Sequence, residues 1–287
     1  MISGVPTTDI ATLKANDSIQ LSQGASNRVI YLHMDQFRED SPYVKAKGGG
    51  DIKNPLMDVR VRKAISMAIS RDAIVDRVME GVAIPSGQLL PEGFFGVSDK
   101  LDVVAYDPDG AKALLAEAGY ADGFELTIHG PNDRYINDAK VAQVIAQMFT
   151  RIGVKTSVNA MTKSVFFKTR NKYEFSVYLA GWGAGTGEMS NPLKALVGTR
   201  SKETGLGGTN RGRYSNTAVD EKILTALKTV DDAKREAILQ EGSRIAMGDY
   251  AILPLHFEVT TWALRKGLTY QARADQYTLA MGVGTAK

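Results

Sequence analysis

The sequence predicts an α/β protein in which helices cover a β-sheet. Residues 124–180 alternate between short apolar runs of period two and longer segments whose apolar residues recur every three or four positions. Strand–helix–strand order with helices of this length is typical of an α/β layer. The composition agrees, because 44% apolar and 23% charged residues over 287 positions allow one large or two medium domains with a substantial core.

The elements of this central region follow from the same periodicities. We expect strands at 124–130, 154–160 and 174–180, separated by helices at 136–153 and 163–171. Gly153 ends the longer helix, since glycine is favoured just beyond a helix C-terminus.

The first third of the chain predicts strands at 18–23 and 27–35 after a short helix within 5–16. Thr8 or Asp9 is the expected N-cap of that helix. The polar stretch 37–55, with three consecutive glycines, is predicted to be a surface loop.

Two helical patterns follow, with caps that the sequence identifies. A helix starts at Asp58, and a second one runs from an N-cap at Ser70 to a stop at Gly81. After a Pro- and Gly-rich connection, Asp107 caps a helix that has Pro108 at its first position, and Gly119 ends it. Toward the C-terminus, helices are expected at 191–198, 218–230 and 231–249, a polar loop at 205–216, and strands at 251–264 and 275–281.

Composition excludes several classes of function. The formal charge is +3, from 35 basic and 32 acidic residues without a dense basic cluster, which argues against a nucleic-acid partner. The absence of cysteine excludes disulfides, iron–sulfur centres and thiolate zinc sites. No run approaches the roughly 20 apolar residues that span a bilayer, and the start lacks a charged-then-apolar signal layout.

The sequence also carries no catalytic, cofactor or metal motif. His33, His129 and His256 lie far apart in strand-like segments, so we expect them to be bonded within the structure rather than to bind a metal. There is no GxSxG elbow, and the glycine-rich stretches match neither phosphate-binding pattern. We therefore expect no cofactor.

The stretch GWGAGTGEMSNP, residues 181–192, directly follows a predicted strand. Ligands of open α/β sheets commonly bind at such strand ends. The alternative is that Trp182 belongs to the core and the glycines only turn the chain. Trp262 is expected to pack on the core or on a neighbouring lobe.

Five blocks of sequence carry a resemblance to a known family. They are DVRVRKAISMAISRDAIV (58–75), YDPDGAKALLAEAGYADGFEL (106–126), FSVYLAGWGAG (175–185), NRGRYSNTAVDEKI (210–223) and AILPLHFEVTTWALRKGL (251–268). In this order and spacing the chain resembles the carboxyl-terminal half of the family 5 solute-binding proteins, which serve ATP-driven importers of peptides, nickel complexes and related solutes. The resemblance implies a periplasmic-binding-protein-like type II lobe with a mixed sheet flanked by helices.

The resemblance also implies a domain organisation and a set of partners. Residues 1–26 correspond to part of a discontinuous lobe I, residues 27–264 to a lobe that closes over the ligand, and residues 265–287 to a return segment of lobe I. It implies a non-enzymatic protein of the periplasm or cell envelope that captures a peptide or peptide-like solute for an ABC permease of the inner membrane. The alternatives are a chaperone-like or signalling peptide binder on the same fold, or a hydrolase without a recognisable motif.

Site residues follow from the positions that match the family pattern. The resemblance implies ligand contacts by Gly181, Trp182, Gly183, Ala184, Gly185, Glu188, Arg170, Arg134 and Tyr135. In such a site the glycines let a ligand approach the backbone closely, free main-chain groups pair with a peptide-like ligand, and Trp182 offers a broad apolar wall. Peptide-binding relatives often read GWxADY, with an aspartate that pairs with the ligand's amino terminus. Here Gly185 takes that position, so either Glu188 reaches back or the ligand presents no ammonium there. The resemblance implies that Arg170 meets a ligand carboxylate, that the loop of Arg134 faces the cleft, and that Tyr135 stacks on the ligand or donates a hydrogen bond to it. Each of the charges at 134, 170 and 188, like Asp133, is also compatible with a solvated surface position.

Overall fold

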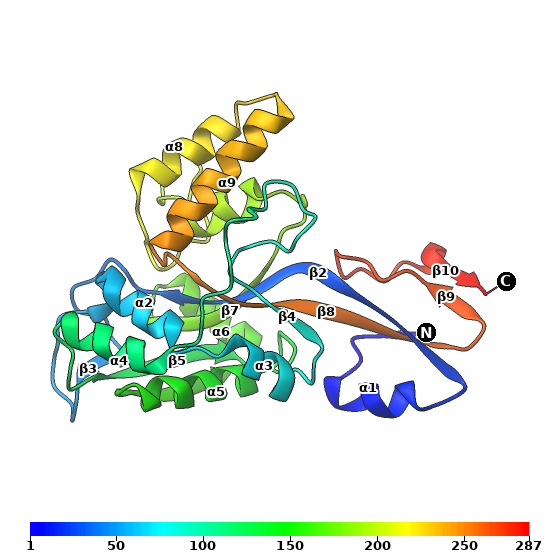
Figure 1. Cartoon of the computed structure of the whole chain (residues 1–287), viewed down its shortest axis with the longest axis horizontal. Coiled ribbons are helices and arrows are strands. Elements are labelled where there is room, and N and C mark those ends of the chain that lie inside the picture. The colour runs from blue at the N-terminus through cyan, green and yellow to red at the C-terminus, as the bar shows by residue number, and fades with distance from the viewer. Residues whose placement is uncertain (287) are drawn as a thin grey trace.

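A computed structural model describes residues 1–286 (Figure 1). Its strands are β1 (Ile2–Ser3), β2 (Ile19–Met34), β3 (Val44–Ala46), β4 (Ala83–Pro85), β5 (Phe124–Pro131), β6 (Val154–Met161), β7 (Val177–Gly183), β8 (Leu253–Arg265), β9 (Leu268–Tyr270) and β10 (Val283–Thr285). Its helices are α1 (Thr7–Lys14), α2 (Val59–Met67), α3 (Arg71–Arg77), α4 (Pro108–Glu117), α5 (Asp138–Arg151), α6 (Lys163–Asn171), α7 (Ser190–Pro192), α8 (Thr217–Ala226) and α9 (Asp232–Gly248). Short helical turns lie at Pro55–Met57, Leu193–Val197 and Ala280–Gly282.

The main sheet is mixed, as predicted. Its strand order is β1-β8-β2-β7-β5-β3, with β4 on β8 and β6 on β5. β5 is parallel to both β6 and β7, whereas β2 is antiparallel to β7 and β8. The crossover through α5 leads outward from β5 to β6, and the crossover through α6 leads back to β7. Right-handed connections therefore place α5 and α6 on opposite faces of the sheet.

Two long strands extend out of this layer. The segments 18–23 and 27–35, predicted as separate strands, form the single 16-residue strand β2, with a register shift against β8 between Ala25 and Val29. Figure 1 shows β2 and β8 running together to a smaller region where α1, β9, β10 and both termini gather.

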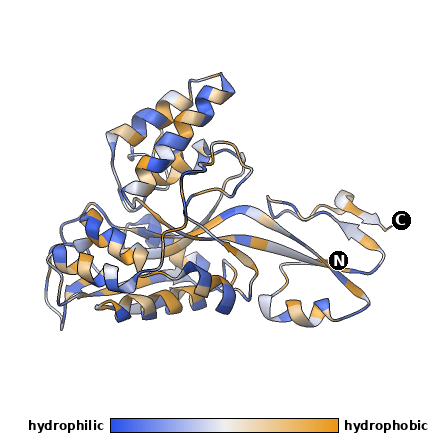
Figure 2. Cartoon of the chain, viewed as in Figure 1, coloured by the Kyte–Doolittle hydropathy of each residue, from blue (hydrophilic) through white to orange (hydrophobic). Residues whose placement is uncertain are grey.

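The apolar core likewise consists of one large cluster and two small ones. One large apolar cluster covers the main sheet, while Val5, Ile10, Val82 and Ala263 form a small separate cluster. A third cluster is built on Trp262, which is fully buried, as expected for a tryptophan that packs in the interior. Figure 2 shows apolar and polar residues interleaved along each covering helix, which is the pattern of an amphipathic helix with one face on the sheet.

Helix boundaries confirm most of the predicted caps. The side chains of Ser70 and Asp107 accept hydrogen bonds from the amides of Ala73 and Gly110. Gly119 and Gly153 adopt left-handed φ angles of 92° and 96° beyond their helices, where a side chain would be strained. The predicted cap at Thr8 or Asp9 is wrong, because α1 already starts at Thr7 after Pro6 and has no side-chain cap.

Two predictions about irregular segments are wrong. The loop expected at 37–55 contains β3, which pairs with β5. The strand expected at 275–281 does not form, and β9 and β10 form a separate two-stranded sheet instead. The hydroxyl of Tyr270 donates to the carbonyl of Tyr277 and accepts from the amide of Leu279, so a side chain satisfies main-chain groups that a strand partner would otherwise take.

Candidate functional site

The candidate site lies at one edge of the main sheet, where the parallel strands end. Arg134 and Tyr135 follow β5, and residues 181–185 form the end of β7 and the turn beyond it. Because β5 and β7 are parallel, their carboxyl ends meet at the same edge, which is where open α/β sheets usually bind ligands. The structure thus brings these two predicted segments together.

Tyr135 lies directly over Gly181. Its hydroxyl donates to the carbonyl of Gly181 at 3.2 Å, and the ring is buried. A Cβ atom at position 181 would lie 2.7 Å from Cε1 of Tyr135 and 2.8 Å from Cδ1 of Ile30. Glycine at this position therefore makes room for Tyr135 inside the protein, a role that the sequence did not indicate.

This contact gives a first testable prediction. Replacing Gly181 by alanine is expected to lower the free energy of unfolding by about 1 to 3 kcal/mol, because the ring of Tyr135 and the methyl of Ile30 must both shift. Urea unfolding followed by circular dichroism measures the loss. The matched control is Gly185→Ala, where an added Cβ meets nothing within 4 Å and the change should stay within about 0.5 kcal/mol. Equal losses in both variants would contradict this packing.

Trp182 points to the face of the sheet opposite Tyr135, because successive strand residues alternate in direction. The indole is half-buried against the core, and its Nε1 donates to Oδ1 of Asn191 at 2.8 Å. Trp182 is therefore neither wholly interior nor free in solvent. One hydrogen bond fixes the ring while part of its surface remains accessible at the strand end.

The residues after Trp182 are tied to β2. The amide of Ala184 donates to the carbonyl of Asn27 at 3.2 Å, and the side-chain amide of Asn27 donates back to the carbonyl of Ala184 at 2.9 Å. Gly183 pairs with Arg28, whose guanidinium would lie 3.3 Å from a Cβ at position 183. The expectation of free main-chain groups is therefore wrong for Ala184, since both of its polar groups are already bonded.

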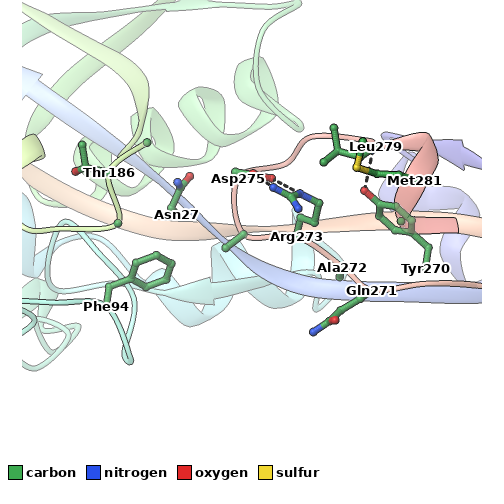
Figure 3. A pocket seen from close by; sticks show the side chains of 14 residues that line it. Asn27, Phe94, Thr186, Tyr270, Gln271, Ala272, Arg273, Asp275, Leu279 and Met281 are labelled. Carbon is green, nitrogen blue, oxygen red and sulfur yellow. Dashed lines mark hydrogen bonds and ion pairs between the residues drawn. The ribbon is translucent and has the colours of Figure 1, made fainter.

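Gly185 borders a cavity of about 670 Å³ (Figure 3). Phe94 and Thr186 lie on one side of it and the C-terminal segment lies on the other, with Arg273 and Asp275 paired to each other. The sequence did not identify Phe94, Arg273 or Asp275 as site residues, because they come from irregular segments without periodicity.

Glu188 is already paired. Its carboxylate lies 3.3 Å from the guanidinium of Arg235 on α9, which also pairs with Asp232 at 2.8 Å. The neighbouring amide of Met189 donates to the carbonyl of Phe95 at 3.0 Å, so this part of the loop is fixed to the protein. The structure therefore does not support the expectation that Glu188 offers a free carboxylate to a ligand ammonium.

Arg170 lies away from the carboxyl edge. It sits in the last turn of α6, with its guanidinium carbon 4.8 Å from the ring centre of Phe167 and 6.0 Å from that of Tyr178. Tyr178 and Trp182 share a face and are four residues apart, roughly 13 Å along the strand. The structure thus does not place Arg170 beside Trp182. In the described part of the chain the guanidinium of Arg170 has no ion pair or hydrogen bond, and its Nε is buried.

Arg134 is exposed and stacks on Tyr135, with 5.1 Å from its guanidinium carbon to the ring centre. Arg28 approaches the same ring at 6.0 Å. Burial raises the pKa of the Tyr135 hydroxyl, whereas its hydrogen bond to Gly181 and the two guanidinium groups oppose that shift. Tyr135 is therefore a neutral hydrogen-bond donor held between two cations.

The sequence missed a polar network behind the site. Glu258 is buried on β8, 3.3 Å from Nε of Arg28, and it accepts a hydrogen bond of 2.8 Å from Gln276. Its other oxygen accepts from the amide of Ile136 at 3.4 Å. These contacts join β2, β8, the start of α5 and the C-terminal segment at the point where the two long strands leave the main layer.

Residues 1–286 meet neither of two simple requirements, those of a metal site and those of a membrane-spanning helix. That part of the chain holds no group of three or more histidine or acidic side chains close enough to bind a metal ion. Equally, none of its helices is long and apolar enough to cross a membrane.

Residues 1–204 match the bacterial extracellular solute-binding proteins, family 5, in the family's middle region. The chain is 28% identical over 270 residues to the glutathione-binding protein GsiB of Shigella dysenteriae, covering 92% of the chain and 49% of that protein. It is 27% identical over 251 residues to the dipeptide-binding protein of Escherichia coli K12, covering 85% and 42%. Against heme-binding protein A of Haemophilus influenzae the identity is 26% over 257 residues, covering 88% and 43%.

Solved structures agree on the fold. HbpA2 from Haemophilus parasuis superposes with a TM-score of 0.80 at 24% identity, covering 98% of this chain and 52% of that one. The periplasmic binding protein DppA from Helicobacter pylori, in complex with the peptide STSA, gives 0.80 at 22% identity, with 99% and 52% covered. The chain spans about half the length of the curated relatives it matches. With the type II periplasmic-binding-protein fold and the matched residues together, the chain belongs to the family 5 bacterial extracellular solute-binding proteins.

Proposed function

We propose that this chain contributes one wall of a ligand cleft in the substrate-binding component of an ABC importer, which captures a peptide or peptide-like solute. The observation that carries the proposal is the half-buried indole of Trp182, fixed by Asn191 at the carboxyl edge of β7. An aromatic ring held rigid at a strand end gives a broad apolar contact at little conformational cost. Capture takes place between lobes and does not alter the solute, so the proposal includes no catalysis.

The charges around the edge favour a particular kind of solute. Gly185 supplies no acid, and the carboxylate of Glu188 is matched by Arg235. Arg134 and Arg170, by contrast, have no carboxylate partner among the described residues. We propose that the ligand carries a free carboxylate and presents no ammonium group at Gly185. A ligand that reaches both Trp182 and Arg170 must span roughly 13 Å, about four extended residues.

The division into lobes belongs to the same proposal. Residues 27–264 form the closing lobe, and residues 1–26 and 265–287 form parts of lobe I. Two small apolar clusters apart from the main core, around Ile10 and Trp262, support a separate lobe at this end, and both take in residues from the end of β8, Ala263 and Leu264 among them. The cavity between Gly185 and the C-terminal segment also lies where the two lobes would meet. Hinge motion where β2 and β8 leave the main layer would close the cleft, and the closed form would be recognised by a permease of the inner membrane. The protein then acts in the periplasm or cell envelope.

In a protein that has both walls of the cleft, Trp182→Ala is expected to weaken solute binding by about 2 kcal/mol or more, the cost of removing a buried aromatic anchor. Isothermal titration with di-, tri- and tetrapeptides, each as free acid and as amide, and with glutathione measures the effect. The free acids should bind more tightly than the amides. The control is Trp262→Phe, which changes the other tryptophan inside the interior. Unchanged affinity in Trp182→Ala would contradict the proposed site, and no heat with any solute would contradict the function.

A further inference from the structure

Three arginines gather around one tyrosine at the end of β7 opposite the candidate site. The guanidinium carbons of Arg213, Arg211 and Arg200 lie 4.7, 5.4 and 5.7 Å from the ring centre of Tyr173. Tyr173 precedes the first residue of β7, and residues 177 to 182 alone span roughly 17 Å. The arginine cluster, defined as Arg200, Arg211 and Arg213, is therefore distinct from the ligand edge at Trp182.

No carboxylate balances this cluster. Among the ion pairs of residues 1–286, none involves a cluster arginine. Burial lowers the pKa of Arg211, and the positive charges of Arg170 and Arg200 lower it further. Three like charges held this close without a counter-charge repel one another, and a bound anion would remove that repulsion.

Hydrogen-bond donors in the cluster also lack acceptors. Arg211 is held in place, because it donates to Oδ1 of Asn171 and to the carbonyl of Gly208. In contrast, Nε of Arg213 and the hydroxyl of Tyr173 are buried and have no partner in the described part of the chain. A buried donor without an acceptor costs about 1 to 3 kcal/mol. The guanidinium carbon of Arg213 lies 4.7 Å from the ring centre of Tyr173 and 5.4 Å from that of Phe37, so the two unpartnered donors belong to one group of stacked side chains.

The backbone holds these groups in an unusual conformation. Tyr173 and Arg213 have φ angles of 62° and 56°, in the left-handed region that side chains disfavour. The C-terminus of α6, which ends at Asn171, helps to hold cations here through its partial negative charge, but it leaves the Nε–H of Arg213 unbonded. The local structure thus keeps the cluster together at some cost in conformational energy.

We propose that the arginine cluster is a binding site for a small oxyanion of the phosphate class, either inorganic phosphate or the phosphate group of a small ester. A doubly charged oxyanion with several acceptor oxygens matches three guanidinium groups better than a single carboxylate does. Its oxygens take up the Nε–H of Arg213 and the hydroxyl of Tyr173. This site adds a ligand beyond the part of the solute held at Trp182, and Arg170, whose charge acts on Arg211, lies between the two.

The test is a titration of the whole chain with sodium phosphate, with sodium chloride as the reference at constant ionic strength. The Nε–Hε resonances of Arg213 and Arg211 in 1H–15N NMR spectra are expected to shift saturably with phosphate and not with chloride. Arg213→Gln should weaken phosphate binding about tenfold or more, the loss expected for one charge-assisted guanidinium contact. Arg151→Gln, at an exposed position without contacts to the cluster, is the matched control and should change nothing.

A second titration with glycerol phosphate separates the two sources. Binding of phosphate alone identifies a site for the free anion, and equal or tighter binding of the ester identifies a site for a phosphorylated compound; both results support the proposal. Absence of a saturable shift in the unmodified chain with either compound would overturn it, whether or not the variants fold. An equal loss of affinity in Arg151→Gln would overturn it as well, because it would reduce the effect to net charge.

Discussion

Lowering the pH from about 7 to about 5 is expected to reduce the free energy of unfolding by about 2 kcal/mol through His256 alone. This side chain is fully buried on β8, and burial lowers its pKa from 6.5 to about 4. Burial acts in the same direction on His33, whose pKa falls to about 3, and on His129, whose pKa falls to about 4. We therefore expect acid to destabilise this protein strongly.

The pH window follows from the direction of the shift. Above pH 6.5 the imidazole of His256 is neutral in both the folded and the unfolded chain, so its full contribution is present. As the pH falls from 6.5 toward 4, the unfolded chain takes up a proton that the folded chain refuses, and stability is lost. Below about pH 4 both states are protonated at this site, and no further loss arises from it.

Urea unfolding at a series of pH values measures this effect. His256→Gln removes the titrating group, so its curve of unfolding free energy against pH should be shallower by up to about 1.4 kcal/mol per pH unit between 6.5 and 4. The slope is the result that matters, whatever the variant's absolute stability. Identical slopes in the variant and in the unmodified chain would contradict the burial of a neutral histidine.

Glu258→Ala is expected to lower the free energy of unfolding by about 3 kcal/mol or more. The change leaves the guanidinium of Arg28 without its carboxylate and removes the acceptor for Gln276 and for the amide of Ile136. Removing one partner of a largely buried ion pair costs far more than the pair itself contributes. Because this network joins the two long strands to the C-terminal segment, the loss should also loosen that segment.

Urea unfolding measures the change in stability, and hydrogen exchange of residues 270–280 measures the loosening. The matched control is Glu39→Gln, which removes a carboxylate 77% exposed and 3.9 Å from Lys53. An exposed pair contributes little, so this control should change stability by less than about 1 kcal/mol. A small loss in Glu258→Ala, similar to that of the control, would show that the network does not hold the strands together.

The sequence predicted the fold well where local signals are strong. The α/β layer, the caps at Ser70 and Asp107 and the left-handed glycines at 119 and 153 depend on residues within one or two turns of each other. The C-terminal strand was predicted wrongly because a tyrosine hydroxyl, and not a neighbouring strand, satisfies the backbone there. That hydroxyl belongs to Tyr270, outside the segment whose pattern was considered.

The candidate site could be predicted only in part. The glycines around Trp182 correctly indicated the end of a strand. They did not indicate that the carbonyl of Gly181 accepts a hydrogen bond from Tyr135, which lies 46 positions away in the sequence. The Glu258 network joins Arg28 to a glutamine 248 positions later, and the ion pair of Glu188 depends on a helix that packs from further along the chain. Periodicity and spacing carry no information about such long-range contacts, which arise only when the sheet assembles.

The most direct test of the proposed ligand edge uses the two indole signals of the chain in 1H–15N NMR spectra. Trp182 is half-buried at the strand end and Trp262 is fully buried, so the second signal is an internal control. Titration with free-acid peptides is expected to shift the Nε1–H signal of Trp182, assigned with Trp182→Phe, and to leave that of Trp262 in place. A signal of Trp182 that stays fixed with every peptide up to millimolar concentration, or a shift of Trp262 instead, would contradict the account.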